Sequence, residues 1–322
     1  SRHVSRGMLD ILLVNWNSGQ QLAEVISSIK KYHLGLVASV IVVDNASTDN
    51  SLELFIAQSD NLPFEFHVIR NTENRGFGVA CNLGATLARS EYLLFLNPDT
   101  RLFENSLSVP LTFMQQQKNS EVGICGIQLI DTTRQVSRTC SRFPSIGRYV
   151  AQALGLSKLS SLQALGHNMA EWDHGDSREV DQIIGAFFFV RVALFRELKG
   201  FDERYFVYFE EVDFSYRAYK MGYRSIFLAG AQAFHAGGGT SQQVKAERLF
   251  YSLRSRLLYG FKHFSCVRAL LLLAVTMLIE PVSRLVFSFL RGGIDDVRNT
   301  LTAYTMLWRA LPAILKRELH KA

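Results

Sequence analysis

The sequence predicts an α/β fold, in which a mostly parallel sheet is flanked by helices and followed by a helical C-terminal region. Two observations predict the sheet: short apolar runs alternate with segments of helical periodicity, and polar residues follow the ends of the apolar runs. A third observation, a basic and apolar stretch after about residue 240, predicts the helical region. The 322 residues are enough to bury a large core.

The first half of the chain contains four runs that are apolar throughout, as expected for strands covered by helices on both faces. The expected elements are strands 10–15, 39–44, 66–69 and 92–96, with helices over 20–32 and 78–88. Strand–helix–strand alternation of this kind predicts parallel strands joined by crossover helices.

The pattern of the next part is less regular. We expect a helix over 106–117, a strand over 122–128, a helix over 210–221 and a short strand over 223–228. The stretch 134–178, which contains Trp172 and His174, carries no clear periodicity. Its length favours a functional or mobile loop rather than core.

Polar residues follow three of the predicted strands. Asn15 and Asn17 follow the first, Asp44 and Asn45 the second, and Asn97-Pro98-Asp99 the fourth. Ligands of open parallel sheets bind beyond the carboxyl ends of the strands, so these clusters predict one site. Asp44 could accept a hydrogen bond from a nucleotide base or ribose, or could only form an Asx-turn or helix cap.

The segment Asn74-Arg75-Gly76-Phe77-Gly78 reads as a turn between a strand and a helix. Backbone N–H groups at the helix start, with Arg75, could face a phosphate, although glycines in turns often serve geometry alone. No Walker lysine or Gly-x-Gly-x-x-Gly follows the first strand, which argues against a P-loop or dinucleotide site. A nucleotidyltransferase would also need a basic triphosphate loop early in the chain, and none is seen.

Asp99 and His235 are candidate metal ligands. A carboxylate at the sheet edge suits Mg²⁺ that bridges a diphosphate, and an imidazole would make Mn²⁺ acceptable. The alternatives are a turn aspartate and a core histidine.

Glu210, Glu211 and Asp213 place three carboxylates within four positions, between aromatic residues. Such crowding shifts pKa values and is typical of proton acceptors and cation sites, although acids also suit any helix start. Asp213 and Arg217 are four residues apart in the favourable acid-first order, so we expect an ion pair between them.

The C-terminal region is basic. From Lys245 onward the chain has 13 Lys and Arg but 5 Asp and Glu, within a net charge of +6. The uncharged apolar run 269–279 has 11 residues, fewer than the roughly 20 that span a bilayer. We therefore expect helices lying in the membrane interface rather than a single-pass anchor, with oligomerisation or helix packing as the alternative.

Residues 1–7 precede Met8 without an apolar segment, so we interpret them as a vector remnant rather than a signal peptide. The four cysteines have no metal-site or redox spacing, which favours free thiols in a reducing cytosol.

Five motifs occur in a specific order: 43–49, 74–84, 97–99, 200–213 and His235 with the glycines at 237–239. Together they resemble the inverting family 2 glycosyltransferases of the GT-A fold over residues 8–240. The most similar branch contains the rhamnosyltransferases that build O-antigen and other bacterial surface polysaccharides. We therefore expect a catalytic domain over 8–240 and a basic amphipathic helical region over 241–322.

The resemblance also implies roles for individual residues. Glu211 matches the catalytic base, which is usually an aspartate, and Asp99 with His235 match the ligands of Mg²⁺ or Mn²⁺. Asn97 stands at the first acid of the family's Asp-x-Asp element. Substrate and nucleotide contacts are expected from Asn15, Asn17, Asp44, Asn45, Asn74, Arg75, Gly76, Asn82, Asn97 and Glu210. Asp213 and Arg217 are expected to support the site.

The implied reaction is metal-dependent transfer of a sugar, with L-rhamnose from dTDP-L-rhamnose as the first choice. The acceptor would be a lipid-linked saccharide at the cytoplasmic face of the bacterial inner membrane. Nucleic acid is not an expected partner, and an oligomer is compatible with the sequence. The alternatives are a UDP-hexose or other sugar-nucleotide donor, or a catalytically silent sugar-nucleotide binding module, given the departures at Asn97 and Glu211.

Overall fold

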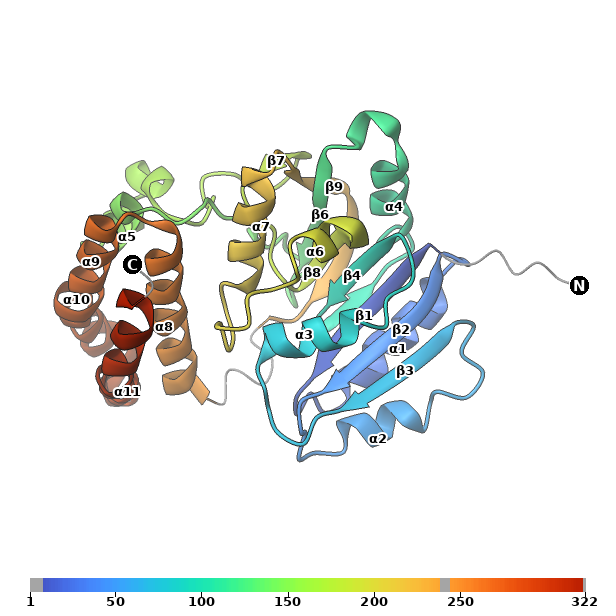
Figure 1. The fold of residues 1–322 in the computed structure, drawn as a ribbon, viewed down its shortest axis with the longest axis horizontal. Helices are drawn as coiled ribbons and strands as arrows, with labels where there is room; N and C mark the ends of the chain where they lie inside the picture. Colours follow the sequence, from blue (N-terminus) through green and yellow to red (C-terminus); the bar gives the residue numbers. More distant parts are fainter. Residues whose placement is uncertain (1–7, 238–243, 321–322) are drawn as a thin grey trace, which may run out of the picture. The chain divides into compact units, whose positions relative to one another are not determined.

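The computed structural model describes residues 8–237 and 244–320, so residues 1–7 and the motif glycines Gly238 and Gly239 lie outside it. The chain divides into two compact units (Figure 1). The sheet unit comprises Ser1–Arg142, Trp172–Glu203 and Glu210–Thr240. The helical unit comprises Phe143–Glu171, Arg204–Phe209 and Ser241–Ala322.

The sheet unit is built on a nine-stranded sheet of order β3-β2-β1-β4-β8-β6-β9-β5, with β7 paired to β9. The strands are β1 (Leu9–Asn15), β2 (Val37–Asp44), β3 (Glu65–Arg70), β4 (Tyr92–Leu96), β5 (Thr100–Leu102), β6 (Val122–Ile130), β7 (Arg178–Val180), β8 (Phe187–Arg191) and β9 (Arg224–His235). The first four strands in sequence are parallel, as predicted. Beyond β4 the sheet is mixed, because β8 runs antiparallel to both of its neighbours.

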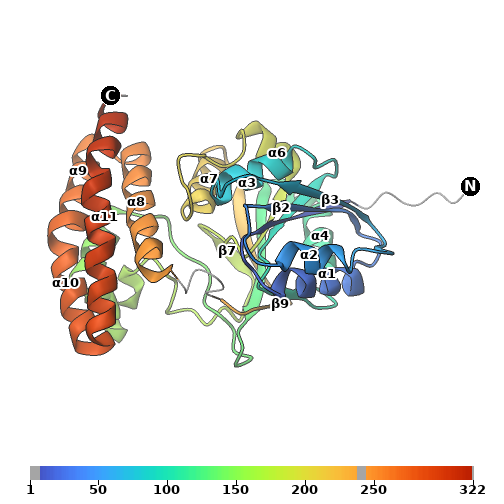
Figure 2. The ribbon, with the colours of Figure 1, turned by 90° about the horizontal axis from the view of Figure 1, so that it is seen from below.

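Helices cover both faces of this sheet. They are α1 (Gln21–Tyr32), α2 (Ser51–Ile56), α3 (Phe77–Ala85), α4 (Ser108–Gln115), α6 (Val192–Glu197) and α7 (Glu210–Lys220). Figure 2 shows α1, α2 and α4 on one face and α3, α6 and α7 on the other. The predicted helices are therefore present, with ends that differ by a few residues from the expected ones.

Strand β8 is the main element that the sequence analysis did not assign. Its five residues form a short apolar run, and such a run cannot be assigned to strand or helix by periodicity alone. Phe188 packs in an aromatic cluster that joins the sheet to α6 and α7. Ring centroids lie 5.0 Å apart for Phe95 and Phe201, and 5.5 Å apart for Phe195 and Phe214. This cluster holds the start of α7 against the sheet.

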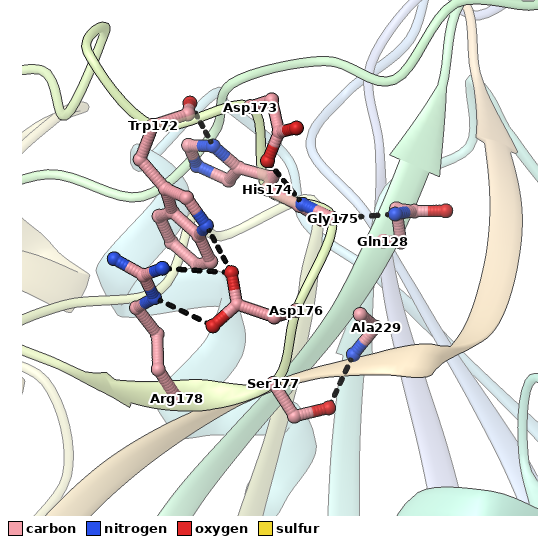
Figure 3. A network of polar contacts seen from close by, with 9 residues as sticks. All are labelled: Gln128, Trp172, Asp173, His174, Gly175, Asp176, Ser177, Arg178 and Ala229. Carbon is pink, nitrogen blue, oxygen red and sulfur yellow. Dashed lines mark hydrogen bonds and ion pairs between the residues drawn. The ribbon is translucent and has the colours of Figure 1, made fainter.

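The stretch 134–178 was expected to be a functional or mobile loop, and this expectation is wrong at Trp172 and His174. Both side chains are buried, with rings stacked 4.0 Å apart (Figure 3). The Cys140 N–H donates to Nε2 of His174 over 3.0 Å, so the ring proton sits on Nδ1 and is donated to the carbonyl of Trp172. Burial lowers the pKa of His174 and keeps it neutral. These residues are core.

Asp176 completes this network. Its carboxylate accepts from Nε1 of Trp172 over 2.7 Å and from two nitrogens of Arg178, whose guanidinium stacks over the Trp172 ring (Figure 3). Gln128 donates to the carbonyl of His174 over 2.9 Å and so ties the segment to β6. The polar side chains of Trp172, His174 and Asp176 are therefore satisfied within this network.

The helical unit contains α5 (Ile146–Ala153), η2 (Leu156–Lys158), η3 (Ser160–Leu165), α8 (Lys245–His263), α9 (Cys266–Ala274), η5 (Val275–Ile279), α10 (Glu280–Phe287), η6 (Ser288–Gly292) and α11 (Gly293–Leu319). The predicted helical character of the C-terminal region is confirmed. As expected, Cys81, Cys125 and Cys140 are buried free thiols, whereas Cys266 is exposed.

The apolar helix of this unit is longer than the sequence suggested. Helix Cys266–Arg291 runs through Glu280 and Pro281 without a break and, in length and composition, could cross a membrane. Only 28% of its most apolar stretch is buried. The uncharged run has 11 residues, as counted from the sequence, but the charged side chains at its end do not terminate the helix, which has 26 residues.

Gly84 provides a test of the packing of α3. A Cβ atom at this position would lie 2.6 Å from Cδ1 of Leu12 and 2.8 Å from Cγ2 of Val43, so only glycine fits. We expect Gly84→Ala to lower the free energy of unfolding by about 1–3 kcal/mol, measured by urea denaturation. Gly230→Ala, where a Cβ meets nothing within 4 Å, is the control and should change little. Equal effects of the two substitutions would contradict the packing.

Candidate active site

The polar residues after three strands meet at one edge of the sheet, as predicted. Asn15 is the register partner of Asp44 across β1 and β2. Leu12 of β1 faces Phe95 of β4, so Asn97 emerges at the same edge. The strand ends therefore bring these side chains together.

Asp44 is held in a buried hydrogen-bond network. Its carboxylate accepts from Nδ2 of Asn15 over 2.8 Å, and from the backbone N–H and hydroxyl of Ser47 over 3.1 and 2.7 Å. The Asx-turn alternative is thus present. An ionised carboxylate has about four acceptor positions, so the turn leaves Asp44 one for a ligand.

Asn17 forms hydrogen bonds with the turn that follows β2. Its backbone is left-handed, with φ of 49°, and its Oδ1 accepts from the backbone N–H of Thr48 over 2.7 Å. The N–H of Asn17 donates to the hydroxyl of Ser47 over 3.0 Å. Asn17 therefore fixes the shape of this edge through contacts within the protein.

The segment Asn74–Gly78 is joined to the end of β2. Nδ2 of Asn45 donates to the carbonyl of Gly76 over 3.0 Å, and Oδ1 of Asn74 accepts from the Gly76 N–H over 3.0 Å. Gly76 has φ of 88°, a conformation that favours glycine, and precedes the first residue of α3. Arg75 is exposed beside this helix start, where its charge can attract a phosphate.

Asn82 has a different position from the one expected for a nucleotide contact. Its Nδ2 donates to the carbonyl of Phe201 over 2.8 Å, and its Oδ1 accepts from the N–H of Phe201 over 2.9 Å. The amide therefore fastens α3 to the segment before α7.

Asp99 and His235 lie side by side, because Thr100 of β5 pairs with His235 of β9. Oδ2 of Asp99 is 3.3 Å from Nε2 of His235. Oδ1 of Asp99 is buried and has no hydrogen-bond partner among the described residues. A buried carboxylate oxygen without a partner is unfavourable unless a cation or donor approaches it, so this pair fits a divalent metal.

The described residues contain no group of three His, Cys, Asp or Glu side chains placed to hold a metal. The protein would thus supply two ligands, leaving the others to water and substrate oxygens. That arrangement is typical of Mg²⁺, and the histidine also makes Mn²⁺ acceptable.

Glu210 was expected to contact substrate, but its carboxyl is almost fully buried. It packs under α3, where a Cβ on Gly78 would lie 3.2 Å from Cγ of Glu210. Its Oε1 has no partner among the described residues. Burial, reinforced by the neighbouring Glu211, raises the pKa of Glu210 well above its ordinary value. The position of Glu210 on α7 therefore points its side chain toward the protein interior.

Glu211 lies beside it but is only half-buried. Its carboxyl lies against Gly185, where a Cβ would be 3.7 Å from Cδ of Glu211. Its carboxylate accepts a hydrogen bond from its own backbone N–H but has no side-chain partner among the described residues, and burial raises its pKa. A partly accessible carboxylate with a raised pKa has the properties of a general base.

The expected Asp213–Arg217 ion pair is confirmed, with Nε of Arg217 2.8 Å from Oδ2 of Asp213. Arg217 also donates to the carbonyls of Leu198 and Gly200 over 2.7 and 2.8 Å. This arginine therefore fixes α7 to the preceding turn.

Gly185 and Ala186 were missed by the sequence analysis. The N–H of Asn97 donates to the carbonyl of Ala186 over 3.0 Å, so the Asn97–Asp99 turn lies next to Ala186, whose neighbour Gly185 lies against the carboxyl of Glu211. A small pair directly before an apolar run was the only signal in the sequence. Gly185 and Ala186 therefore connect the candidate base with the turn that carries the candidate metal ligand Asp99.

Comparisons with known proteins agree with this geometry. Residues 10–173 match the model of Glycosyl transferase family 2, and residues 92–318 match that of Glycosyl transferase family group 2. The N-acetylglucosaminyl-diphospho-decaprenol L-rhamnosyltransferase of Mycobacterium tuberculosis is 24% identical over 242 residues, which cover 71% of this chain and 76% of that protein. The rhamnosyltransferase WbbL of Escherichia coli is 24% identical over 174 residues, 53% of this chain and 62% of WbbL.

Among solved structures, a mannosyltransferase from Pyrobaculum calidifontis in complex with GDP-mannose and Mn²⁺ has a TM-score of 0.54. It is 17% identical, and the match covers 98% of this chain and 87% of the mannosyltransferase. The fold is that of the GT-A glycosyltransferases. Since the family model spans half of the sequence and both relatives transfer rhamnose, this chain belongs to the family 2 glycosyltransferases, in their rhamnosyltransferase-like branch.

Proposed function

We propose that this enzyme transfers a sugar from a nucleotide donor, with inversion, onto a hydroxyl of a lipid-linked saccharide at the cytoplasmic face of the inner membrane. One observation carries the proposal. The Asn97–Asp99 turn has His235 on one side, 3.3 Å from Asp99, and on the other Ala186, whose neighbour Gly185 lies against Glu211. A cation site and a free base at one sheet edge are what this transfer requires.

The donor and acceptor are inferred from the relatives. Both are named rhamnosyltransferases, and one of them acts on a diphospho-decaprenol acceptor. We take dTDP-L-rhamnose as the donor and a polyprenyl-diphosphate saccharide as the acceptor class. A UDP-hexose or other sugar nucleotide is the alternative donor, since a GT-A neighbour binds GDP-mannose.

Each unit has its own role in this proposal. The sheet unit, within residues 8–240, binds the donor and performs transfer. The basic helical region 241–322 associates with the membrane surface, where the lipid-linked acceptor resides.

Asp99 and His235 would hold the metal ion, Mg²⁺ or Mn²⁺. When bound, it would neutralise charge on the departing nucleoside diphosphate. Asp44 and the Asn74–Gly76 turn position the nucleotide. Arg75 adds positive charge near the diphosphate, where the exposed start of α3 also favours an anion.

Glu211 removes the proton from the acceptor hydroxyl as that oxygen attacks the anomeric carbon from the face opposite the leaving group. Attack from that face inverts the centre, and its transition state resembles that of glycoside hydrolysis. Burial and the neighbouring Glu211 raise the pKa of Glu210 well above its ordinary value, which favours its neutral form. A neutral Glu210 opposes ionisation of the base less than a second carboxylate would.

The alternative from another class is a sugar-nucleotide binding module without activity, suggested by Asn97 and Glu211 where the family usually has aspartates. The partly accessible carboxylate of Glu211, which has no side-chain partner among the described residues, argues for an active enzyme. A panel of sugar nucleotides with Mg²⁺ or Mn²⁺ and a lipid acceptor separates the two. Release of a nucleoside diphosphate from one donor is expected, and no turnover of any donor would support the binding module.

Glu211→Gln should lower the rate of transfer by about 10²–10⁴-fold, because the amide cannot accept the proton. Donor affinity, measured by calorimetry, should stay nearly unchanged. Glu104→Gln, at an exposed acid outside the site, is the matched control and should retain full activity. A fully active Glu211→Gln enzyme would show that another carboxylate is the base.

The raised pKa of Glu210 makes stability depend on pH. The folded protein keeps this proton above the ordinary value of 4.5, where the unfolded chain has lost it. The free energy of unfolding therefore falls as the pH rises above 4.5. Glu210→Gln removes this contribution, so its stability relative to the wild type should increase between pH 5 and pH 8 in urea titrations. Glu104→Gln should show no such trend, and a constant difference for Glu210→Gln would contradict the assignment.

A further inference from the structure

We propose that the helical unit binds the surface of an anionic bilayer through one composite face. The face consists of the outward side of helix Cys266–Arg291 together with the segment Leu154–Leu165, and the helix lies in the plane of the interface instead of crossing it. This deepens the membrane association in the proposed function and rests on that proposal only for the biological setting.

The first component is an exposed apolar stripe along the helix. Val267 and Phe289, near its two ends, are 69% and 75% exposed. Most of the exposed apolar residues recur every three, four or seven positions, as expected for one helix face, and a few adjacent pairs widen the stripe: Val267, Leu270, Leu271, Leu278, Ile279, Val282, Val286, Phe289 and Leu290. Leu272 and Met277 point inward and are buried. The helix is therefore amphipathic within its own unit.

The second component comes from the stretch that the sequence analysis described only as a loop. Leu154, Leu156, Leu159 and Leu165 are all exposed, Leu154 to 60%. This segment adjoins the helix, because Nζ of Lys158 lies 3.3 Å from the ring centroid of Phe287. A Cβ on Gly155 would lie 3.7 Å from the same ring. Two distant parts of the chain thus present leucines beside one another.

Basic side chains accompany this face. Lys158 and Arg291 both lie over the ring of Phe287, and Arg268 is exposed near the start of the same helix as Arg291. None of these three forms an ion pair with an acid in the described part of the chain. Unpaired cations beside exposed apolar side chains complement the anionic headgroups and acyl boundary of a bilayer. We therefore commit to a lipid surface as the occupant rather than a second protein copy.

The inner side of the helix argues against a span. Glu280 lies in the middle of the helix, is 3% exposed, and bonds Arg256 of α8 and Arg284. Nε of Arg284 is 2.9 Å from its Oε1. A crossing helix would either leave this carboxylate without Arg256 or carry α8, with its other charged residues, into the hydrocarbon. The helix is long enough to cross a membrane, but the packing of Glu280 against Arg256 favours a helix that lies in the plane of the interface.

The first test measures binding of the full-length protein to sealed vesicles of phosphatidylcholine, alone or mixed with phosphatidylglycerol. We expect binding only to the mixed vesicles and weaker binding in high salt. Two double variants should each weaken binding at least about tenfold. One combines Leu154→Ser with Leu159→Ser, and the other combines Phe289→Ser with Leu290→Ser. Leu34→Ser with Ile56→Ser, exposed apolar residues of the sheet unit, is the matched control and should bind like the wild type.

Wild-type vesicle binding by the Leu154 and Leu159 variant would overturn the composite face, provided that thermal melting shows it folded. A change in oligomeric mass in place of vesicle binding would assign the face to a second copy. Nucleoside diphosphate release in detergent should be unchanged in all variants. Loss of vesicle binding with turnover intact therefore separates this inference from the proposed function.

The second test distinguishes an in-plane helix from a crossing one. Among the cysteines in the described part of the chain only Cys266 is exposed, and it lies at the start of the helix. Asp295→Cys adds an exposed thiol beyond the helix end. With the protein bound to preformed vesicles, a membrane-impermeant maleimide added outside should label both thiols. Protection of the thiol at position 295 alone would show a crossing helix and overturn the in-plane arrangement.

Discussion

The site depends on how Arg217 fixes the first turns of α7. Its guanidinium bonds Asp213 within the helix and the carbonyls of Leu198 and Gly200 before it. A planar guanidinium that uses three nitrogens in this way leaves the helix little freedom to rotate or slide. The rotation of α7 in turn decides which acid points inward and which remains accessible.

Two neighbouring glutamates consequently meet different surroundings. Glu210 enters the narrow space left by Gly78, whereas Glu211 lies over Gly185. Gly78 and Gly185 have no side chain, so the two glutamates approach backbone at these positions. Burial raises the pKa of both carboxyls, and the adjacent Glu211 raises that of Glu210 further.

The sequence predicted the parallel half of the sheet and its polar edge because buried strands and strand-end polar residues have a strong local pattern. It also predicted the Asp213–Arg217 pair, which depends on helical spacing alone. The pairing of Asp99 with His235 depends on the β5–β9 ladder, and only the family resemblance suggested it. The burial of Glu210 was not predictable, because acids at a helix start give no indication of which side faces the core. Trp172 and His174 were misjudged since polar residues that satisfy one another resemble a loop.

The helical unit has a consequence for how the protein can be divided. Its residues come from three separate parts of the chain, Phe143–Glu171, Arg204–Phe209 and Ser241–Ala322. Removing the C-terminal helices would strip Tyr149 of Arg256, whose guanidinium stacks on its ring, and Arg204 of its partner Glu318. The helical unit therefore cannot be removed by truncating the C-terminus alone. Its transfer to another enzyme would require the two inner segments as well as the C-terminal helices, so exchange of one continuous domain would not be enough.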